Sequence, residues 1–391
     1  MTLNKTLRRR FGDALRVLSS LKLALLIFVA LGAGVLVSYL SEVRTTWALV
    51  APLALLAVNL SASVATNAAF RRQKALLVFH LALIAIVLLL MAGRLTYLRG
   101  TLELTRGALF DGNLTSYEAG PLHYWRLKDV RFLHDGFEID YAPGTPNQGF
   151  GTDVGRDIPA TTPDIAMAGV TRPTAADPAP TAGVTRPTTQ PSAVSDTRGA
   201  RRGETRNRVH WLDAQEVWRT EVIGDNRPLE ILGYQFFTTG NKGFSPLFVW
   251  TPTGGTPVTG SINLPSYPLN EYKQHLEWTP PGASFKLWTQ LQFDEVLIDP
   301  YKPSQFRLPE RHRIVIRLDN NRYELQPGGS VNLPGGTLEY RELSTWMGYN
   351  VNSDWTISWL LAACIAAMIS LAWHFWRKYA ARPWQTDEDK A

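Results

Sequence analysis

Three polar side chains stand inside long apolar runs and are the residues of this sequence best able to do chemistry. They are His80, Asn59 and His374. An ionisable residue within a membrane span is costly and is a functional candidate by default. An imidazole there can be an axial ligand of haem iron, or it can form a hydrogen bond between helices. The residue type alone leaves both interpretations of His80 open.

Asn59 and His80 are expected at similar depths in a membrane. Each lies six or seven residues from the Arg- and Lys-rich turn between their two apolar runs, or about 10 Å at a helical rise of about 1.5 Å per residue. A bond from Asn59 would orient the imidazole, as partners of metal ligands do, but we favour a structural bond between helices. His374 stands beside Trp373 and near Trp376, which is typical of the aromatic belt at a membrane surface, with haem contact as the weaker alternative.

Four apolar runs are each long enough to cross about 30 Å of hydrocarbon as a helix. Their expected bounds are residues 21–40, 47–66, 74–92 and 355–376. We expect the first run to be an uncleaved anchor, because two more spans follow it at once. The chain therefore divides into a cytoplasmic amphipathic segment (residues 1–20), a three-helix membrane segment (21–93), an extracytoplasmic region (94–354), a fourth membrane helix (355–376) and a tail (377–391).

Basic residues predict the orientation of these helices. They cluster before the first run, between the second and third, and after the fourth, at Arg8–Arg10, Arg71–Lys74 and Arg377–Lys378. With four crossings all three clusters fall on one side, which the positive-inside rule assigns to the cytoplasm. Both termini are then cytoplasmic. We expect a multi-pass protein of the cell membrane, that is, the inner (cytoplasmic) membrane. Three arginines oppose the rule at the outer end of the third helix and are outvoted: Arg94, Arg99 and Arg106.

Residues 94–354 are expected to form an antiparallel β-sandwich or barrel-like domain, because short β-prone runs alternate there with Gly and Pro turns. Asp135-Gly136 separates two such runs and predicts a hairpin. Residues 142–208 differ, since they are rich in Pro, Thr, Ala and Gly and repeat the unit Ala-Gly-Val-Thr-Arg-Pro-Thr at 168–174 and 182–188. This composition buries too little apolar surface to offset chain entropy, so we predict a disordered insertion.

The other chemistry-bearing residues form no recognisable motif. The single cysteine, Cys364, excludes an intramolecular disulfide and a Cys-x-x-Cys redox pair. No pair of histidines has metal-ligand spacing, and no nucleophile elbow or phosphate-binding loop is present. The net charge of +6 is concentrated beside the apolar runs, which indicates membrane topology rather than binding to nucleic acid.

Four segments resemble one known family. They are Leu15–Ala24 before the first span, Val78–Leu83 with Arg99–Gly107, Asp225–Glu230 with Gly233–Phe237, and Gly348–Val351 before the last span. In this order, and with three helices before and one helix after a β-domain, they resemble the ResB family of cytochrome c biogenesis proteins. The sequence departs from the family where Gly34–Ser38 replaces a Gly-Thr-x-x-Pro-like segment, and in its insertion.

The resemblance implies a role in haem delivery that the chain does not perform alone. In that family the protein works with a tryptophan-rich membrane subunit, CcsA, and the pair moves haem outward and presents it to the Cys-x-x-Cys-His site of apocytochrome c. The chain would be an accessory subunit with haem in transit, and not an enzyme by itself. A histidine in the matching span is implicated in family haem binding, which favours His80. Two other functions stay open: a structural assembly factor that never binds haem, and a membrane-anchored sensor or solute-binding subunit.

Overall fold

The computed structural model describes residues 15–40, 46–143 and 200–380. Four helices in these ranges are long and apolar enough to cross a membrane: α2 (Leu21–Leu40), α3 (Thr46–Thr66), α5 (Lys74–Thr96) and α6 (Thr356–Ala380). The short α4 (Ala68–Arg72) joins α3 to α5. The four predicted helices are confirmed, and α5 and α6 each end four residues later than predicted. Most of the predicted amphipathic segment (residues 1–20) and of the tail (377–391) lies outside the described residues.

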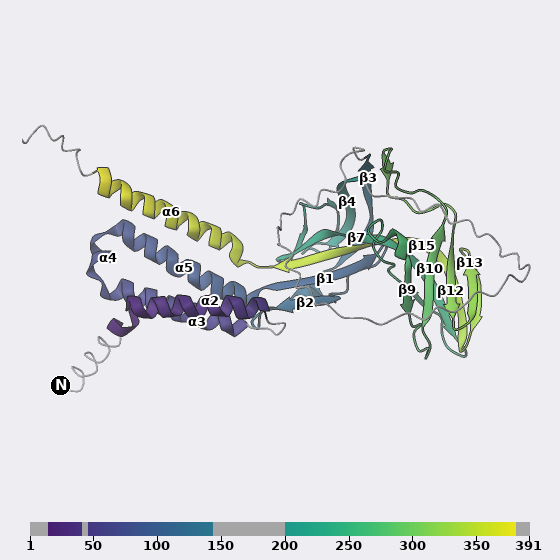
Figure 1. The fold of residues 1–391 in the computed structure, drawn as a ribbon, viewed down its shortest axis with the longest axis horizontal. Helices are drawn as coiled ribbons and strands as arrows, with labels where there is room; N and C mark the ends of the chain where they lie inside the picture. The colour runs from purple at the N-terminus through teal and green to yellow at the C-terminus, as the bar shows by residue number, and fades with distance from the viewer. Residues whose placement is uncertain (1–14, 41–45, 144–199, 381–391) are drawn as a thin grey trace, which may run out of the picture. The chain divides into compact units, whose positions relative to one another are not determined.

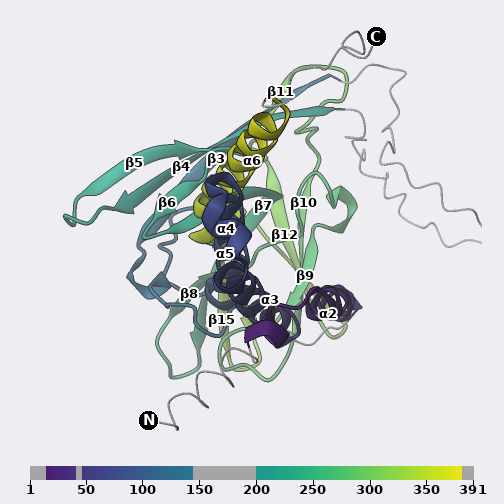
Figure 2. The same cartoon turned by 90° about the vertical axis from the view of Figure 1, so that its left-hand side faces the viewer.

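The long helices pack in the order α2, α3, α5, α6 (Figure 1; Figure 2). Apolar side chains of the first three form one cluster, made of Ile27, Leu53, Leu56, Ala57 and Val87. The side chains that α6 buries are small, namely Thr356, Ala367 and Ser370. Small residues let helix backbones approach closely, and membrane helices depend on such packing because lipid supplies no hydrophobic force between them.

The described chain forms two compact units, each assembled from separate stretches of sequence. Of the described residues, unit 1 comprises 15–40, 46–137, 206–242 and 346–380 and contains helices α2 to α6. Within it, β1 (Leu98–Thr105) starts two residues after α5 ends, and β15 (Gly336–Ser353) leads into α6. The two strands pair antiparallel from Leu98 opposite Ser353 to Thr105 opposite Trp346. This pairing holds the last turn of α5 next to the first turn of α6.

The other strands of unit 1 flank this central pair and enclose an apolar core. They are β2 (Ser116–Ala119), β5 (Trp218–Ile223), β6 (Leu229–Ile231) and parts of β3 (Phe132–Ala142), β4 (Arg201–Leu212) and β7 (Tyr234–Pro252). The rings of Phe110, Phe132 and Phe236 meet in the core with centroids 4.9 to 5.6 Å apart. Alternate residues of β1 enter it, since Leu98, Leu102 and Leu104 are buried.

Of the described residues, unit 2 comprises 138–143, 200–205 and 243–345 and is built mainly of strands. Its main sheet has the order β13-β12-β10-β9, with bounds Asn321–Leu325, His312–Leu318, Leu287–Phe293 and His275–Trp278. β8 (Val258–Ser261), β11 (Ser304–Gln305) and β14 (Ser330–Leu333) pair with β7, β3 and β15. The predicted antiparallel pairing is confirmed, whereas the finer prediction of a sandwich or barrel is not confirmed by these sheets.

Two predictions about β3 and β4 are wrong. Asp135-Gly136 does not turn the chain, because β3 runs through it and Gly136 takes φ +120° inside the strand; glycine permits such a local irregularity without reversal. The predicted insertion also ends too late, since β4 begins at Arg201. In β4 the buried positions alternate, and two of them are the polar Thr205 and Asn207, which a composition argument counts as solvent-exposed. Residues 144–199 of the insertion lie outside the described residues.

Candidate functional site

His80 lies in the second turn of α5 with its ring half-buried. Its Nδ1 lies 2.8 Å from the carbonyl oxygen of Leu76, one helical turn earlier. A carbonyl oxygen only accepts hydrogen bonds, so Nδ1 carries the hydrogen and Nε2 of the neutral ring keeps its lone pair. Among the described residues His80 has no second hydrogen-bond partner. The ring is therefore held in the tautomer in which Nε2 is available to a metal.

Two phenylalanine rings flank this imidazole. The ring centroid of Phe70, a buried residue of α4, lies 4.3 Å from that of His80, and Phe79 meets the imidazole edge-on at 5.4 Å. These contacts limit rotation of the imidazole and give it aromatic neighbours.

Asn59 is buried on α3 but does not contact His80. Its Nδ2 donates to the carbonyl oxygens of Leu18 and Ser20, at 2.5 and 3.2 Å. Both hydrogens of the amide are used in this way, so Asn59 ties the segment before α2 to α3. The structural role is the one that the geometry supports, and the predicted bond from Asn59 to the imidazole does not form among the described residues.

His374 lies half-buried on α6, at the same end of the helix pair as His80. Gly93 of α5 lies against Thr356 of α6, so these two residues mark the same height on the two helices. His80 precedes Gly93 by 13 residues, and His374 follows Thr356 by 18 residues. At about 1.5 Å per residue the two histidines are about 8 Å apart along the helix axes. The ring of His374 packs on Phe375 at 5.6 Å. The described contacts do not join His374 to His80.

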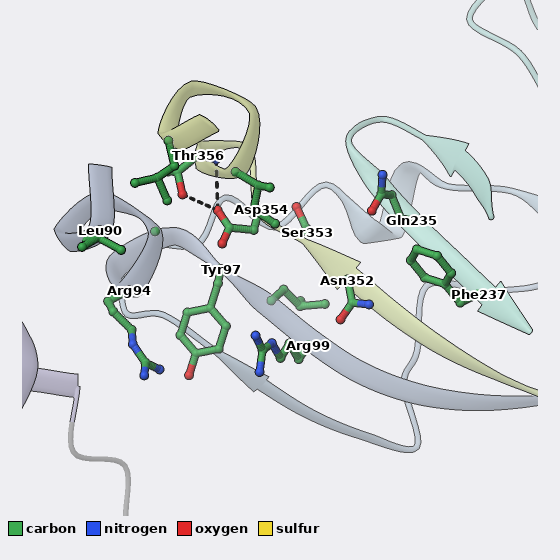
Figure 3. A pocket seen from close by; sticks show the side chains of 14 residues that line it. Leu90, Arg94, Tyr97, Arg99, Gln235, Phe237, Asn352, Ser353, Asp354 and Thr356 are labelled. Carbon is green, nitrogen blue, oxygen red and sulfur yellow. Dashed lines mark hydrogen bonds between the residues drawn. The ribbon is translucent and has the colours of Figure 1, made fainter. Parts of the chain in front are cut away.

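A second candidate site is a cavity of about 600 Å³ where α5 and α6 meet the strands of unit 1 (Figure 3). We call it the junction pocket. Its lining has two parts. The helices contribute the apolar side chains of Leu90, Ile357 and Leu360 together with Arg94, and the strands contribute mainly polar side chains, which include Arg99, Gln235 and Asn352.

Two arginines give the junction pocket its charge. Arg94 and Arg99 are exposed, and neither has a carboxylate partner among the described residues. Asp354 is the one carboxylate in the lining, and its Oδ1 accepts from the backbone N–H and the hydroxyl of Thr356 at 3.0 and 2.7 Å. Those bonds cap the first turn of α6. The neighbouring Tyr97 hydroxyl donates to Glu118.

A third group of polar residues is buried in the strands of unit 1. Asn207 Nδ2 donates to the Tyr349 hydroxyl at 2.7 Å, and that hydroxyl lies 3.0 Å from Nδ1 of His134. All three side chains are fully buried. Burial lowers the pKa of His134 to about 4 and raises the pKa of Tyr349. Because the neutral imidazole accepts from Tyr349, this cluster holds three strands together and has no access to solvent or substrate.

The sequence signals for the second and third groups were visible but pointed elsewhere. Arg94 and Arg99 stood out only as exceptions to the charge rule. In the sequence, Gly348-Tyr349 resembles the family but has no assigned role. In the structure the first position needs glycine, because a Cβ atom at residue 348 would meet Thr239 Oγ1 at 2.9 Å and the Asn241 carbonyl at 3.1 Å. His134 was one of several scattered histidines. Only the pairing of distant strands brings these residues together.

The comparisons with known proteins identify a family. The model of the ResB-like family matches residues 57–287, which is more than half of the chain. The matched range includes Asn59, His80 and both junction-pocket arginines, whereas His374 and Tyr349 lie beyond it. No curated protein matches the chain. Within the described residues, no group of three His, Cys, Asp or Glu side chains is placed to hold a metal ion.

Proposed function

Because the chain belongs to the ResB-like family, we propose that it is a membrane subunit of a cytochrome c biogenesis complex. It helps to export haem and to present it to apocytochrome c for covalent attachment. It is an accessory subunit, which acts with a tryptophan-rich partner of the CcsA type. Four apolar helices of spanning length and the family match support this proposal.

His80 is the observation that carries the haem part of the proposal. Its Nδ1 is bonded to the Leu76 carbonyl, so Nε2 faces the apolar surroundings as an unused lone pair. Haem iron is the cargo that would bind there. The exposed Arg72, which ends α4, and the exposed Lys74, which begins α5, are cations suited to haem propionates. A histidine that only joined helices would instead bond to a neighbouring helix, whereas this one bonds within its own.

The partner and the orientation belong to the same proposal. A single axial histidine leaves the opposite face of haem iron for a ligand from another protein, which fits transfer between two subunits. The basic clusters support a proposed orientation with both termini in the cytoplasm. The strand-rich part of the chain then lies outside the inner membrane, where apocytochrome c is found, and offers it a docking surface.

Cytochrome c maturation in cells tests this function. The full chain and its partner are expressed with a reporter apocytochrome, and covalent haem in the reporter is measured. We expect His80→Ala to abolish maturation at normal protein level, and added imidazole to restore part of it by replacing the lost ligand. His275→Ala is the matched control, because His275 is a half-exposed histidine of unit 2. Full maturation with His80→Ala would leave the structural assembly factor as the better account.

A further inference from the structure

We propose that the junction pocket binds the headgroup of an anionic phospholipid. The proposal rests on the proposed insertion of the four helices in a membrane, and not on haem binding by His80. It concerns Arg94, Arg99 and the apolar residues of α5 and α6 that share the pocket with them.

The two-part lining matches an amphiphile. Leu90, Ile357 and Leu360 lie on the helices, where acyl chains surround the protein. Arg94 belongs to the last turn of α5 and Arg99 to β1, so the two charges stand at the end of the helix and on the first strand. A phosphate group accepts bonds from the planar guanidinium in a paired geometry, and the bonds are strengthened by charge. The amide side chains of Gln235 and Asn352 add neutral hydrogen-bonding groups for the rest of the headgroup.

The level of the pocket in the membrane follows from the last turn of α5. The loop after β2 is bonded to this turn, since Leu122 N donates to the Leu95 carbonyl at 2.8 Å and the His123 ring bonds to the Thr96 carbonyl at 2.7 Å. The same region carries large exposed side chains, which are Leu122, Tyr124, Trp125 and Trp355. Trp355 Nε1 also donates to Thr96 Oγ1 at 3.0 Å.

Trp and Tyr at helix ends mark the layer of lipid headgroups. The junction pocket is built on the same turn of α5, so Arg94 and Arg99 lie in that layer. This location explains two of the three arginines that oppose the positive-inside rule, since they neutralise bound phosphate. Asp354, the one carboxylate in the lining, does not neutralise them, because it is already bonded to the first turn of α6. Basic pockets beside membrane helices bind anionic headgroups in this way.

Native mass spectrometry of the purified full chain in detergent tests the proposal. Phosphatidylglycerol and phosphatidylcholine are added at equal concentrations, and retained lipids are counted. We expect a preference for phosphatidylglycerol that falls by about 10- to 30-fold in the double variant Arg94→Gln, Arg99→Gln, since each basic residue near an anionic surface contributes a factor of about five. Arg106→Gln is the matched control, because this arginine lies near the end of β1 and outside the lining.

Two further variants keep the result unambiguous. The double variant Arg94→Lys, Arg99→Lys keeps the charge and should retain most of the preference, which excludes misfolding as the cause. His80→Ala should leave lipid binding unchanged, so the failure of haem binding and the failure of this proposal can be told apart. Equal retention of both lipids by the wild type, or an unchanged preference in the glutamine variant, would overturn the proposal. Loss of haem instead of lipid from that variant would overturn it too and assign the pocket to the cargo.

Discussion

The buried His134 should make unit 1 sensitive to mild acid. The imidazole is fully buried and accepts from the Tyr349 hydroxyl, and its Nε2 has no hydrogen-bond partner among the described residues. Protonation would place a hydrogen on Nδ1, where the Tyr349 hydroxyl now donates, and would bury an unpaired charge. Burial therefore lowers the pKa of His134 from 6.5 to about 4.

The direction and size of the effect follow from proton binding in the two states. The folded pKa lies below the unfolded one, so the neutral histidine contributes stability that is complete above pH 6.5 and is lost as the pH falls towards 4. The value pH 5 lies about 1.5 units below the pKa of the unfolded histidine, and each unit lowers the free energy of unfolding by about 1.36 kcal/mol. The expected loss of stability is about 2 kcal/mol, or about 30-fold in an opening equilibrium.

Hydrogen exchange of the full chain, followed by mass spectrometry at pH 7 and pH 5, measures this loss. After correction for intrinsic exchange rates, peptides of β3 and β15 should lose about 30-fold in protection. His134→Asn is the control, because its side-chain oxygen still accepts from Tyr349 but does not titrate. This variant should be less stable at pH 7 and should change little down to pH 5. Equal pH dependence in wild type and variant would refute the assignment to His134.

Four other outcomes are expected. Tags at either terminus should report the cytoplasm and a tag near residue 171 the outside, and protease access to that tag from the cytoplasmic side would reverse the orientation. Deleting residues 146–198 with a short turn in their place should leave maturation near normal, because Gly203 of β4 lies directly against Asp140 of β3; loss of maturation at normal protein level would show that the segment has a function. Asn59→Ala should lower the melting temperature, at a cost of about 1 kcal/mol, without changing haem content. Gly348→Ala should cost about 1–3 kcal/mol by overpacking, measured by thermal unfolding.

The helices were predictable because their signal is local. A run of about 20 apolar residues has few alternatives to a membrane helix, so the bounds of α2 were predicted to the residue and α5 differed only at its end. The extra residues of α5 include Arg94 and Thr96, which are polar, and the Thr96 hydroxyl donates to the Ala92 carbonyl of the preceding turn at 2.9 Å.

The strands were less predictable because their signal depends on distant partners. Asp135-Gly136 has the composition of a hairpin turn, but β3 continues through it as a strand paired with the distant β4, while β11 pairs with β3 only at Asp140 and Tyr141. The start of β4 carries polar residues such as Asn207, whose burial makes sense only once Tyr349, 142 residues later, supplies a hydroxyl. Composition within a window does not contain that information.

The candidate sites also differ in whether their sequence signal is local or depends on distant residues. His80 was predictable because an ionisable residue in an apolar run is conspicuous by itself. Its bond to Leu76 was not, since the two predicted alternatives were haem and a neighbouring helix. The junction pocket required β15 to return beside β1, which brings Asn352 and Asp354 next to Arg94 and Arg99.

The absorption spectrum of the full chain, purified from the membrane with its partner subunit, tests the central claim most directly. Wild-type protein should carry haem with a Soret band. His80→Ala should lose that band at unchanged abundance and recover part of it when imidazole is added, because imidazole replaces the missing axial ligand. A His80→Ala protein with full haem content and an unchanged Soret band would contradict the account and leave His80 as a residue bonded only to its own helix.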